Sequence, residues 1–363
     1  MIPKELKAGL SAYRAVVKKL PDNSAVQILC ALEAVRAYQV FETVFWESKS
    51  DPIPPLGAEI ARLTATLTGL DGEYADAIYD KKVAHQPVGT NTARAANKVA
   101  DTKTLTGELY SSLFNRFDNR HYFAEATDLL RQRIDRNAIG YDWLQGKKGL
   151  DAGCGGGRYT VALASLGAAK VTGIDYGRDN IKDAKLRSRS AGIDKVNFRH
   201  ADVLNIPYRD NSFDFVFSNG VLHHTTDPQR GIEELFRVLK PGGKMWIFLY
   251  GSSLWWEMMD VLRPLSAKAS RQQMQHVMQL MGYAPNRIFK FMDSLYVPII
   301  ESYTAKQMEG MLKRAGFADL QQLHRCVETP FFRGVNELLW DGEPFADVRW
   351  GAGELRYLGQ KPL

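Results

Sequence analysis

The sequence predicts an α/β fold built on a doubly wound sheet of seven mostly parallel strands. Three observations support this fold. From residue 147 onward, short apolar runs alternate with helical stretches, as expected for parallel strands joined by right-handed crossovers. A glycine-rich segment, residues 150–159, directly follows the first of these runs. Helical patterning before the first strand and after the fifth predicts an N-terminal helical region and a helical insertion.

The N-terminal part of the chain is expected to be mainly helical. Apolar residues such as Ile28 and Leu32 recur at helical spacing, and we expect two packed helices within residues 3–46. The segment SDPIPPLG at residues 50–57 should end them, because proline restricts its own backbone and that of the preceding residue. A further helix is expected over residues 58–67.

The following residues connect this region to the sheet. Residues 79–104 are polar and basic with little apolar period, which indicates a linker or a mobile lid. Residues 108–144 return to helical patterning just before the first strand. We therefore expect two domains: residues 1–105 form an N-terminal helical accessory region with the linker or lid, and residues 106–363 contain the sheet.

The alternation assigns each element of the second domain. The expected strands cover residues 148–152, 170–175, 196–201, 213–218, 244–250, 320–325 and 355–360. The expected helices cover residues 159–166, 179–191, 229–239 and 304–315, the last one capped by Gly316. Residues 252–303 form a helical insertion that is rich in methionine and aromatic residues. Because ligands of such sheets bind beyond the carboxyl ends of the strands, we expect the functional site there.

The composition is ordinary for a soluble globular protein. Hydrophobic residues make up 45% of the 363 residues, and a net charge of +6 spread over this length does not by itself predict a nucleic-acid partner. The three cysteines, Cys30, Cys154 and Cys326, lie too far apart for paired metal ligands or a disulfide framework. No secretory signal or membrane span is apparent. We expect a cytoplasmic protein with no metal site.

The strand ends carry residues suited to a nucleotide-containing ligand. Glycines of the first turn let a ligand approach the backbone and permit positive φ angles. Asp175 closes the second expected strand, where its carboxylate can accept hydrogen bonds from both hydroxyls of a ribose. Asp202 ends the third strand, where it could accept from an adenine amino group while the Val203 amide meets the ring.

The run from Asp151 to Tyr250 resembles the class I, Rossmann-like S-adenosylmethionine-dependent methyltransferase family, especially its small-molecule branch. The resemblance does not cover residues 1–105 and is loose over residues 252–303. It implies S-adenosylmethionine as the cofactor and S-adenosylhomocysteine as the product. The residues that it assigns to the cofactor are Asp151, Gly153, Gly155, Gly157, Asp175, Tyr176, Asp202, Val203, Asn219 and Gly220. Asp151 and the three glycines would hold the methionine end, with Asn219 and Gly220 beside it.

Two histidines follow the fourth expected strand. Methyl transfer from a sulfonium is an in-line displacement, so a base is needed only if the acceptor must lose a proton. Adjacent residues of an extended segment point to opposite sides, so we expect at most one of His223 and His224 to face the substrate. In similar sequences the second histidine borders the substrate, and we predict His224 as the catalytic base. The alternative is that it caps the next turn or packs under the cofactor.

Aromatic residues outside the core motifs are expected to form the substrate pocket. Tyr110 and Phe123 precede the first strand, and the run ETPFFRGVNELLW at residues 328–340 favours a closed pocket for a small molecule or a short peptide side chain. The alternative is that such residues belong to the core. The residues predicted to line the pocket are Tyr122, His223, Tyr250, Trp255 and Tyr296.

The predicted activity is S-adenosylmethionine-dependent methyl transfer to an oxygen, nitrogen or carbon atom of a small molecule. The fourth strand ends in SNGV and lacks the Asn/Asp-Pro-Pro-aromatic signature that similar enzymes use on DNA bases, which disfavours a nucleic-acid substrate. Three alternatives stay open: a peptide, protein or RNA methyltransferase, a nicotinamide-dependent oxidoreductase, and a non-catalytic protein on the same fold. The oligomeric state is also open, with a homodimer as one alternative.

Overall fold

The computed structural model describes residues 2–21, 24–70, 98–114, 119–328, 337–339 and 343–363. These residues fall into two compact units. Unit 1 comprises Met1–Lys98, Ser253–Tyr296 and Glu343–Arg349, and unit 2 comprises Val99–Ser252, Val297–Gly342 and Trp350–Leu363. The insertion after the fifth strand of the sheet thus belongs with the N-terminal helices as one compact unit.

Unit 1 is helical. Its elements are α1 (Lys4–Lys19), α2 (Ser24–Glu42), a π-helical turn η1 (Thr43–Glu47), α3 (Ile53–Thr68), α10 (Leu254–Ser266), α11 (Arg271–Leu280), α12 (Pro285–Tyr296) and most of α14 (Ala346–Trp350). The two helices expected within residues 3–46 are present as α1 and α2, but α1 packs mainly on α3 and α2 mainly on α10, so the expectation that they pack on each other is wrong. The helix break expected over residues 50–57 ends earlier than predicted, since α3 begins at Ile53. Pro54 and Pro55 fit in its first turn because no backbone N–H is needed there for a helical hydrogen bond.

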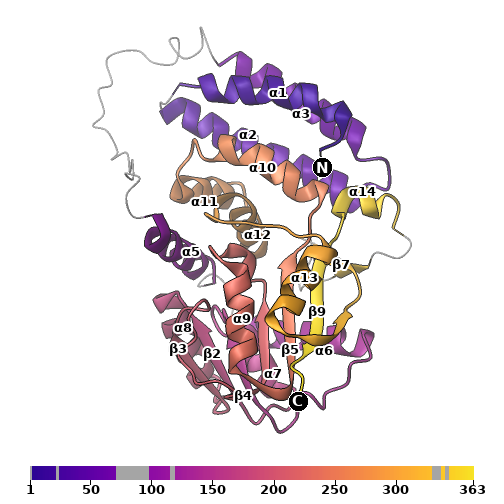
Figure 1. The fold of residues 1–363 in the computed structure, drawn as a ribbon. Helices are drawn as coiled ribbons and strands as arrows, with labels where there is room; N and C mark the ends of the chain where they lie inside the picture. Colours follow the sequence, from indigo (N-terminus) through magenta and orange to yellow (C-terminus); the bar gives the residue numbers. More distant parts are fainter. Residues whose placement is uncertain (1, 22–23, 71–97, 115–118, 329–336, 340–342) are drawn as a thin grey trace. The chain divides into compact units, whose positions relative to one another are not determined.

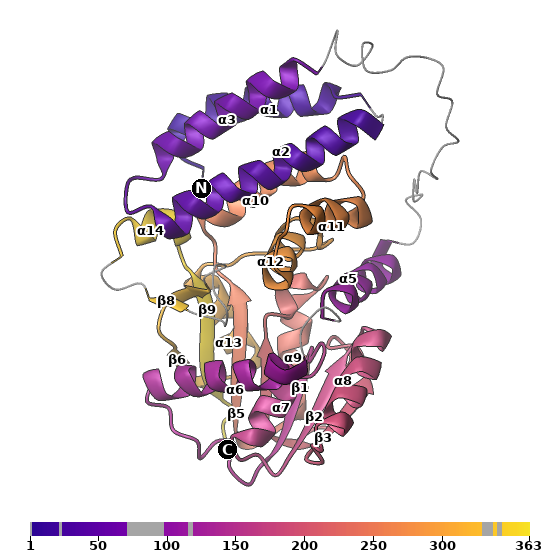
Figure 2. The ribbon, with the colours of Figure 1, turned by 180° about the vertical axis from the view of Figure 1, so that it is seen from behind.

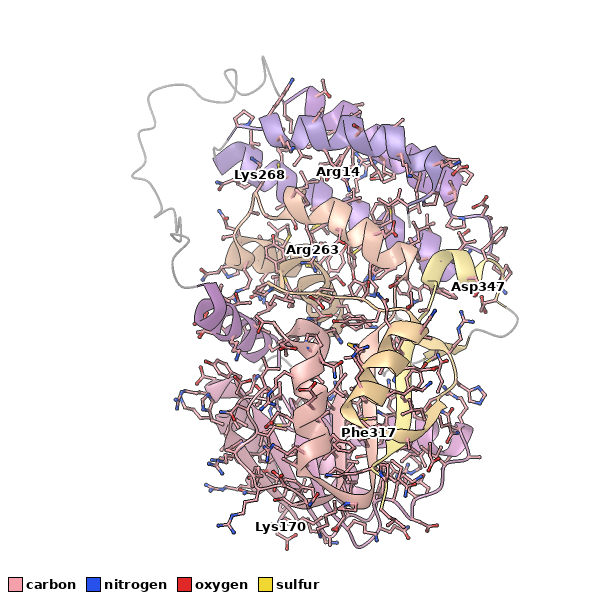
Figure 3. All side chains as sticks on the ribbon, viewed as in Figure 1. Arg14, Lys170, Arg263, Lys268, Phe317 and Asp347 are labelled. Carbon is pink, nitrogen blue, oxygen red and sulfur yellow. The ribbon has the colours of Figure 1, made fainter. Side chains whose placement is uncertain are left out.

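Side chains of the N-terminal helices and of the inserted helices hold unit 1 together. Trp255 of α10 packs edge-on against Trp46, with ring centroids 4.4 Å apart, and it also contacts Tyr38 and Phe45. Arg263, labelled in Figure 3, donates a hydrogen bond of 2.8 Å to the Ser294 carbonyl oxygen of α12. The inserted helices are therefore part of the interior of unit 1.

Unit 2 contains the sheet, whose strand order is β3-β2-β1-β4-β5-β9-β6. The strands are β1 (Lys148–Ala152), β2 (Lys170–Asp175), β3 (Val196–His200), β4 (Phe213–Asn219), β5 (Leu239–Tyr250), β6 (Ala318–Gln322) and β9 (Glu354–Gln360). The first five are mutually parallel, and β9 runs antiparallel to both of its neighbours. The predicted doubly wound, seven-stranded and mostly parallel sheet is confirmed. A short antiparallel pair, β7 (Cys326–Glu328) and β8 (Glu337–Leu339), is separate from it.

Helices cover both faces of this sheet. In Figure 1, α9 (Pro228–Val238) and α13 (Ala305–Ala315) lie in front of the strands, and Figure 2 shows α6 (Asn119–Arg136) and α7 (Arg158–Ser165) on the opposite face. Residues of β5 alternate between the two cores: Met245 and Ile247 pack with α9 and α13, and Trp246 packs with α6 and α7. Further elements are α5 (Lys98–Phe114), α8 (Arg178–Ser190) and a short 3₁₀ turn η2 (Leu222–His224).

Some expected boundaries differ from the observed ones. The strands β1 and β2 have the predicted limits, but β5 begins at Leu239, five residues before the predicted start. The expected linker or lid at residues 79–104 falls mainly outside the described residues, and its last part, from residue 98, is helical in α5. The aromatic run at residues 328–340 also lies largely outside the described residues.

Candidate functional site

The turn between β1 and α7 has the backbone that the sequence predicted. Gly153, Gly155 and Gly157 have φ angles of 83°, 50° and 85°, a region that side chains other than glycine rarely adopt. The Gly155 amide donates a hydrogen bond of 2.8 Å to Asp175 Oδ2. At Gly157 an added Cβ would lie 2.8 Å from the Phe198 ring. The turn is thus fixed against the end of β2, and its glycines are required by backbone geometry and close packing.

Asp175 ends β2 and organises the surrounding backbone. Its Oδ1 accepts from the Gly177 amide at 2.8 Å and from Asn180 Nδ2 at 3.1 Å, and its Oδ2 accepts from Gly155. Burial raises the pKa of this carboxyl, while these three hydrogen bonds favour the ionised form and oppose the shift. A carboxylate has about four acceptor positions, so about one remains, on Oδ2. As placed, Asp175 can accept from one ribose hydroxyl, and a second would have to displace a present donor.

Asp151 lies near the end of β1, just before the glycine turn. Its side chain is buried, and Asp151 Oδ2 accepts a hydrogen bond of 2.6 Å from the Thr160 hydroxyl of α7. Burial raises the pKa of Asp151 to about 7, the Thr160 hydroxyl opposes this shift, and the nearby charge of Asp175 adds to it. The carboxyl would be stabilised as an anion by a cationic group, and the ammonium of a bound methionine moiety is such a group.

The residues after β3 pair with α5. Asp202 Oδ1 accepts from the Leu204 amide at 2.9 Å, and Asp202 Oδ2 forms an ion pair with Lys103 of α5. The Lys103 ammonium also lies 5.8 Å from the ring centroid of Tyr176. The Val203 side chain is buried in the sheet core. Sequence reasoning missed Lys103, since it lies in the segment expected to be a linker, where no apolar period indicates a helix face.

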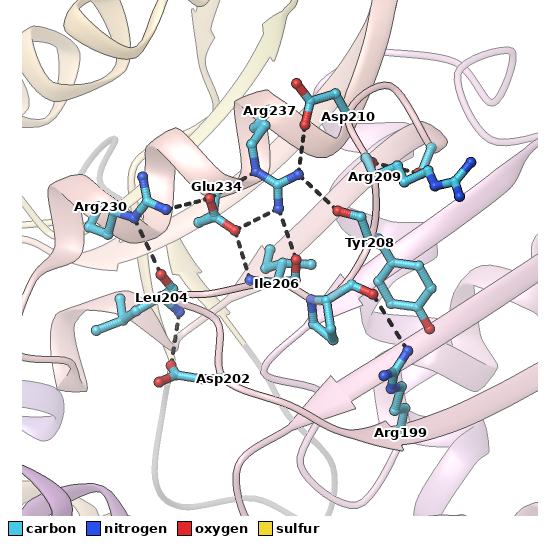
Figure 4. A network of polar contacts seen from close by, with 12 residues as sticks. Arg199, Asp202, Leu204, Ile206, Tyr208, Arg209, Asp210, Arg230, Glu234 and Arg237 are labelled. Carbon is cyan, nitrogen blue, oxygen red and sulfur yellow. Dashed lines mark hydrogen bonds and ion pairs between the residues drawn. The ribbon is translucent and has the colours of Figure 1, made fainter.

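A polar network behind Asp202 fixes the loop that follows β3 (Figure 4). Glu234 of α9 is 1% exposed, and its Oε2 accepts from the Ile206 amide at 2.7 Å. Arg237 donates to the carbonyl oxygens of Ile206 and Tyr208, each at 2.8 Å, and also binds Glu234. Although burial opposes ionisation, hydrogen bonds from Arg237 and the Ile206 amide lower the pKa of Glu234. The backbone leading away from Asp202 is therefore anchored to a helix of the core.

The end of β4 carries the remaining predicted cofactor residues. Asn219 Oδ1 accepts a hydrogen bond of 3.3 Å from Trp246 Nε1, which fixes its side chain against β5. Gly220 has a φ of 78°, and its amide donates to the Phe248 carbonyl oxygen at 3.2 Å. The chain can turn sharply here because glycine adopts this φ without strain.

The two histidines lie in a 3₁₀ turn, and the expectation of an extended segment is wrong. In this turn the rings of His223 and His224 are neighbours, with centroids 4.1 Å apart, and both side chains are buried. His223 stacks on Tyr250 at 3.7 Å, and its Nδ1 accepts from the Tyr250 amide at 3.4 Å. Burial and, to a smaller extent, His224 hold the pKa of His223 well below its usual value, so this ring is neutral. Within the described part of the chain, His223 Nε2 has no hydrogen-bond partner.

His224 has a partner on each ring nitrogen. Its Nδ1 lies 2.9 Å from the Ile299 carbonyl oxygen, and its Nε2 lies 3.0 Å from the hydroxyl of Tyr110 on α5. The predicted catalytic histidine is thus held by two segments that are distant from it in sequence. Tyr110, which the sequence indicated only as one of several aromatic residues near the site, contacts it directly.

The other predicted pocket residues lie in different surroundings. The hydroxyl of Tyr122 contacts the glycine turn, since a Cβ added to Gly156 would lie 2.0 Å from the hydroxyl oxygen. On the ring of Tyr122, the Arg187 guanidinium lies 4.6 Å from the centroid. Trp255 and Tyr296 belong to unit 1. Trp255 packs among aromatic rings there, and the Tyr296 hydroxyl donates to the Ser266 carbonyl oxygen at 2.6 Å. Their role in a substrate pocket stays a prediction.

A hollow elsewhere in unit 2 is not this site. It is lined by residues such as Lys147 and Asp214, which lie next to or within the amino ends of β1 and β4, and Lys244 of β5, which pairs with Phe215 near the start of β4. The acidic residues and glycines described above lie at the carboxyl ends of the strands, where ligands of parallel sheets bind. The described residues contain no group of three histidine, cysteine or acidic side chains that could hold a metal ion, and none of their helices is long and apolar enough to cross a membrane.

Comparisons with known proteins agree with this geometry. Residues 150–247 match a family described as a methyltransferase domain. Methyltransferase GfsG of Streptomyces halstedii is 34% identical over 173 residues, which cover 43% of this chain and 59% of the relative. The 27-O-demethylrifamycin SV methyltransferase of Amycolatopsis mediterranei is 38% identical over 101 residues, which cover 28% of this chain and 37% of the relative. The chain thus matches less than two thirds of the length of either relative.

A solved structure of a SAM-dependent methyltransferase from Thermotoga maritima matches 70% of this chain and 99% of its own, with 17% identity and a TM-score of 0.45. The sheet order, the glycine turn and the acids at the strand ends define a class I, Rossmann-like domain. Residues 150–247 belong to the family described as a methyltransferase domain.

Proposed function

We propose that the protein is an S-adenosylmethionine-dependent methyltransferase that acts on a small molecule. The observation that carries this proposal is the Asp175 carboxylate at the end of β2, which is held by the Gly155 amide and retains acceptor capacity on Oδ2. Asp202 stands at the end of the neighbouring strand, with its side chain 26% exposed. An acid at each of two adjacent strand ends beside a glycine turn suits the ribose and the adenine of one nucleoside.

The chain's own residues fit this cofactor. Asp151 would pair with the methionine ammonium, and Asp175 would accept a hydrogen bond from a ribose hydroxyl. Asp202 would accept a hydrogen bond from the adenine amino group after its ion pair with Lys103 opens. When bound, the cofactor supplies a methyl group on a sulfonium. The protein's part in an in-line displacement is to orient the acceptor behind that methyl group and to exclude water.

A small-molecule acceptor is supported by the relatives. The Amycolatopsis protein is named a 27-O-demethylrifamycin SV methyltransferase, and we propose an acceptor of comparable kind for this chain. The three cysteines are buried with free thiols, which fits the reducing cytoplasm that we propose as its location.

Cofactor binding is tested first by thermal unfolding with added nucleotides. We expect S-adenosylhomocysteine to raise Tm and NAD to leave it unchanged, because only a ligand that binds the folded protein stabilises it against unfolding. The purified protein is then incubated with S-adenosylmethionine carrying a ¹³C methyl group and a deproteinised cell extract. Mass spectrometry should show a labelled methyl group on a small molecule.

A pair of glycine variants separates binding from folding. Gly155→Val should abolish the Tm rise, because a branched side chain would take the space that the ligand needs beside the backbone. Gly146→Val is the matched control. Gly146 also has a positive φ, of 69°, but it precedes β1 and so lies at the amino ends of the strands, away from the proposed site. A Gly155→Val protein that binds S-adenosylhomocysteine normally, or a wild type stabilised by NAD instead, contradicts the proposal.

A further inference from the structure

The hydrogen bonds of His224 determine its protonation pattern. A carbonyl oxygen can only accept, so the 2.9 Å contact with Ile299 requires that Nδ1 carries a proton and donates it. In the neutral ring Nε2 is then the acceptor, and the Tyr110 hydroxyl at 3.0 Å donates to it. The result is a directed chain of hydrogen bonds from Tyr110 through His224 to the backbone of Ile299.

This arrangement prevents His224 from acting directly on a substrate. Its only basic atom, Nε2, is already bonded to Tyr110 Oη. His224 is 7% exposed, whereas Tyr110 is half-buried and therefore more accessible. A proton from an acceptor would reach the imidazole by way of the phenol.

The helix α5 places Tyr110 at the edge of the sheet where the cofactor residues lie. Lys103, Gly107 and Tyr110 are spaced as one face of a helix. Lys103 pairs with Asp202 after β3, and a Cβ on Gly107 would lie 3.1 Å from Gly177 Cα after β2. With Tyr110 bonded to the turn after β4, this face spans the carboxyl ends of β3, β2 and β4, the last of which is separated from β2 by β1. The phenol is thus fixed relative to the glycines and acids of the site.

We propose that Tyr110 is the catalytic residue that takes the proton from a hydroxyl group of the methyl acceptor, with His224 as the positioning residue that receives the proton of Tyr110. This proposal rests on the proposed function. The acceptor O–H bond breaks as its proton moves to Tyr110 Oη, and the original phenol proton moves to His224 Nε2. The acceptor oxygen forms the new bond to the methyl carbon, and the electrons of the carbon–sulfur bond stay on sulfur. One positive charge is present throughout: it begins on the sulfonium and ends on the imidazolium.

The relay specifies the class of acceptor. A neutral amine attacks with its lone pair and can lose its proton afterwards, so it does not need a base during the displacement. A hydroxyl oxygen becomes a strong nucleophile only as its proton leaves. The Tyr110–His224 pair therefore points to an alcohol or a phenol, and not a neutral amine, as the acceptor, with methylation at its oxygen as the proposed reaction.

The first arm of the test needs no acceptor. Protein labelled with ¹⁵N at histidine is examined by NMR with bound S-adenosylhomocysteine. We expect His224 to have a protonated Nδ1 and an unprotonated Nε2, and Tyr110→Phe to shift the Nε2 resonance while Nδ1 stays protonated. A proton found on Nε2 would overturn the proposal, because Tyr110 would then accept from the ring and could not pass it a proton.

The second arm measures transfer of a labelled methyl group from S-adenosylmethionine to small molecules of the cell extract. Tyr110→Phe should lower the rate by about a hundredfold with little change in affinity for S-adenosylhomocysteine, as for loss of a general base. The wild type should be slower in D₂O, and Tyr110→Phe should lose this isotope effect. A merely structural tyrosine would leave the isotope effect in place. Tyr141→Phe is the matched control, since it removes a phenol bonded to Asp135 away from these residues.

The outcomes separate the two proposals. Equal rates for Tyr110→Phe and the wild type, or labelled products methylated only on nitrogen, contradict the role of Tyr110 while the proposed function stands. Products methylated only on carbon contradict the oxygen as the acceptor atom. A wild type that binds S-adenosylhomocysteine and transfers no methyl group contradicts the proposed function and, with it, the proton relay.

Discussion

Asp175 is the clearest case in which one side chain has a structural role and a proposed binding role. It accepts from two backbone amides and one side-chain amide, so it fixes both the glycine turn after β1 and the turn that precedes α8. A ligand hydroxyl would then be the fourth donor to this carboxylate. Loss of the side chain affects the backbone of the site together with the ligand contact.

We predict that Asp175→Ala lowers the affinity for S-adenosylhomocysteine by about tenfold to a hundredfold, as a charged hydrogen bond contributes about 1.5 to 3 kcal/mol. Titration calorimetry measures the affinity. Asp179→Ala is the control, because Asp179 lies four residues further on and is exposed on α8, where it pairs with Lys182. Equal affinities for the two variants would contradict the assignment of Asp175 to the ribose.

Asp151 predicts a pH dependence of stability. Burial raises its pKa to about 7, so between about pH 4 and 7 the folded protein binds this proton more tightly than the unfolded chain does. The stabilisation from this proton is therefore present at low pH and is lost as the pH rises through about 7. Asp151→Asn does not titrate, and at pH 8 we expect its ligand-free form to be more stable than the wild type by about 2 to 4 kcal/mol.

Urea unfolding of both proteins at pH 5 and pH 8 checks this. The difference in the free energy of unfolding should grow toward pH 8, since only the wild type then contains a buried carboxylate. A difference that stays constant with pH would show that Asp151 is ionised throughout this range.

At the scale of single elements, α5 is the helix that completes the site, and its fit depends on a glycine. A Cβ at Gly107 would lie 3.1 Å from the Gly177 backbone, which cannot easily yield. At Gly310 of α13 the nearest atom is the flexible end of Arg314, at 3.3 Å. Two chemically identical substitutions should therefore have different effects.

We predict that Gly310→Ala stabilises the protein by about 0.5 to 1 kcal/mol, because alanine favours a helix over glycine. Gly107→Ala should give no gain or a loss, since the steric cost at Gly177 offsets the helix propensity. Thermal and urea unfolding measure both. If Gly107→Ala stabilises as much as Gly310→Ala, then α5 does not pack closely on this turn.

The helix α9 secures the loop after β3 through Glu234. We predict that Arg237→Ala destabilises by about 2 to 4 kcal/mol, because it removes an ion pair of a buried carboxylate and two hydrogen bonds to loop carbonyls. Arg230→Ala should cost about 1 kcal/mol or less, because its side chain is 48% exposed and solvent screens the pair. Similar losses in the two variants would contradict the role of Arg237 as the loop anchor.

At the scale of the whole molecule, unit 1 is assembled from three separate stretches of chain. Trp255 and Met258 of α10 are buried in the intact protein, and Trp255 packs on aromatic residues of α2 and η1. We predict that a chain beginning at Val99 aggregates or binds hydrophobic dyes, since the apolar faces of α10 and α12 would be exposed. Size-exclusion chromatography and dye fluorescence check this, and a monodisperse product that binds no dye would contradict it.

The sequence alone determined the sheet and the residues at its strand ends. The limits of β1 and β2, the glycine turn, and the positions of Asp175 and Asp202 follow from apolar periods and turn residues within short segments, and such local patterns do not depend on distant contacts. The order of these motifs also indicated the family.

Only the tertiary structure decided which side chains meet at those strand ends. Tyr110 and His224 are 114 positions apart, and Lys103 and Asp202 are 99 positions apart, so no local period could pair them. The same holds for the 3₁₀ turn that brings His223 beside His224, and for the packing of the inserted helices with α2. These features depend on long-range packing and on hydrogen-bond partners such as Ile299, which a single sequence does not encode as a readable pattern.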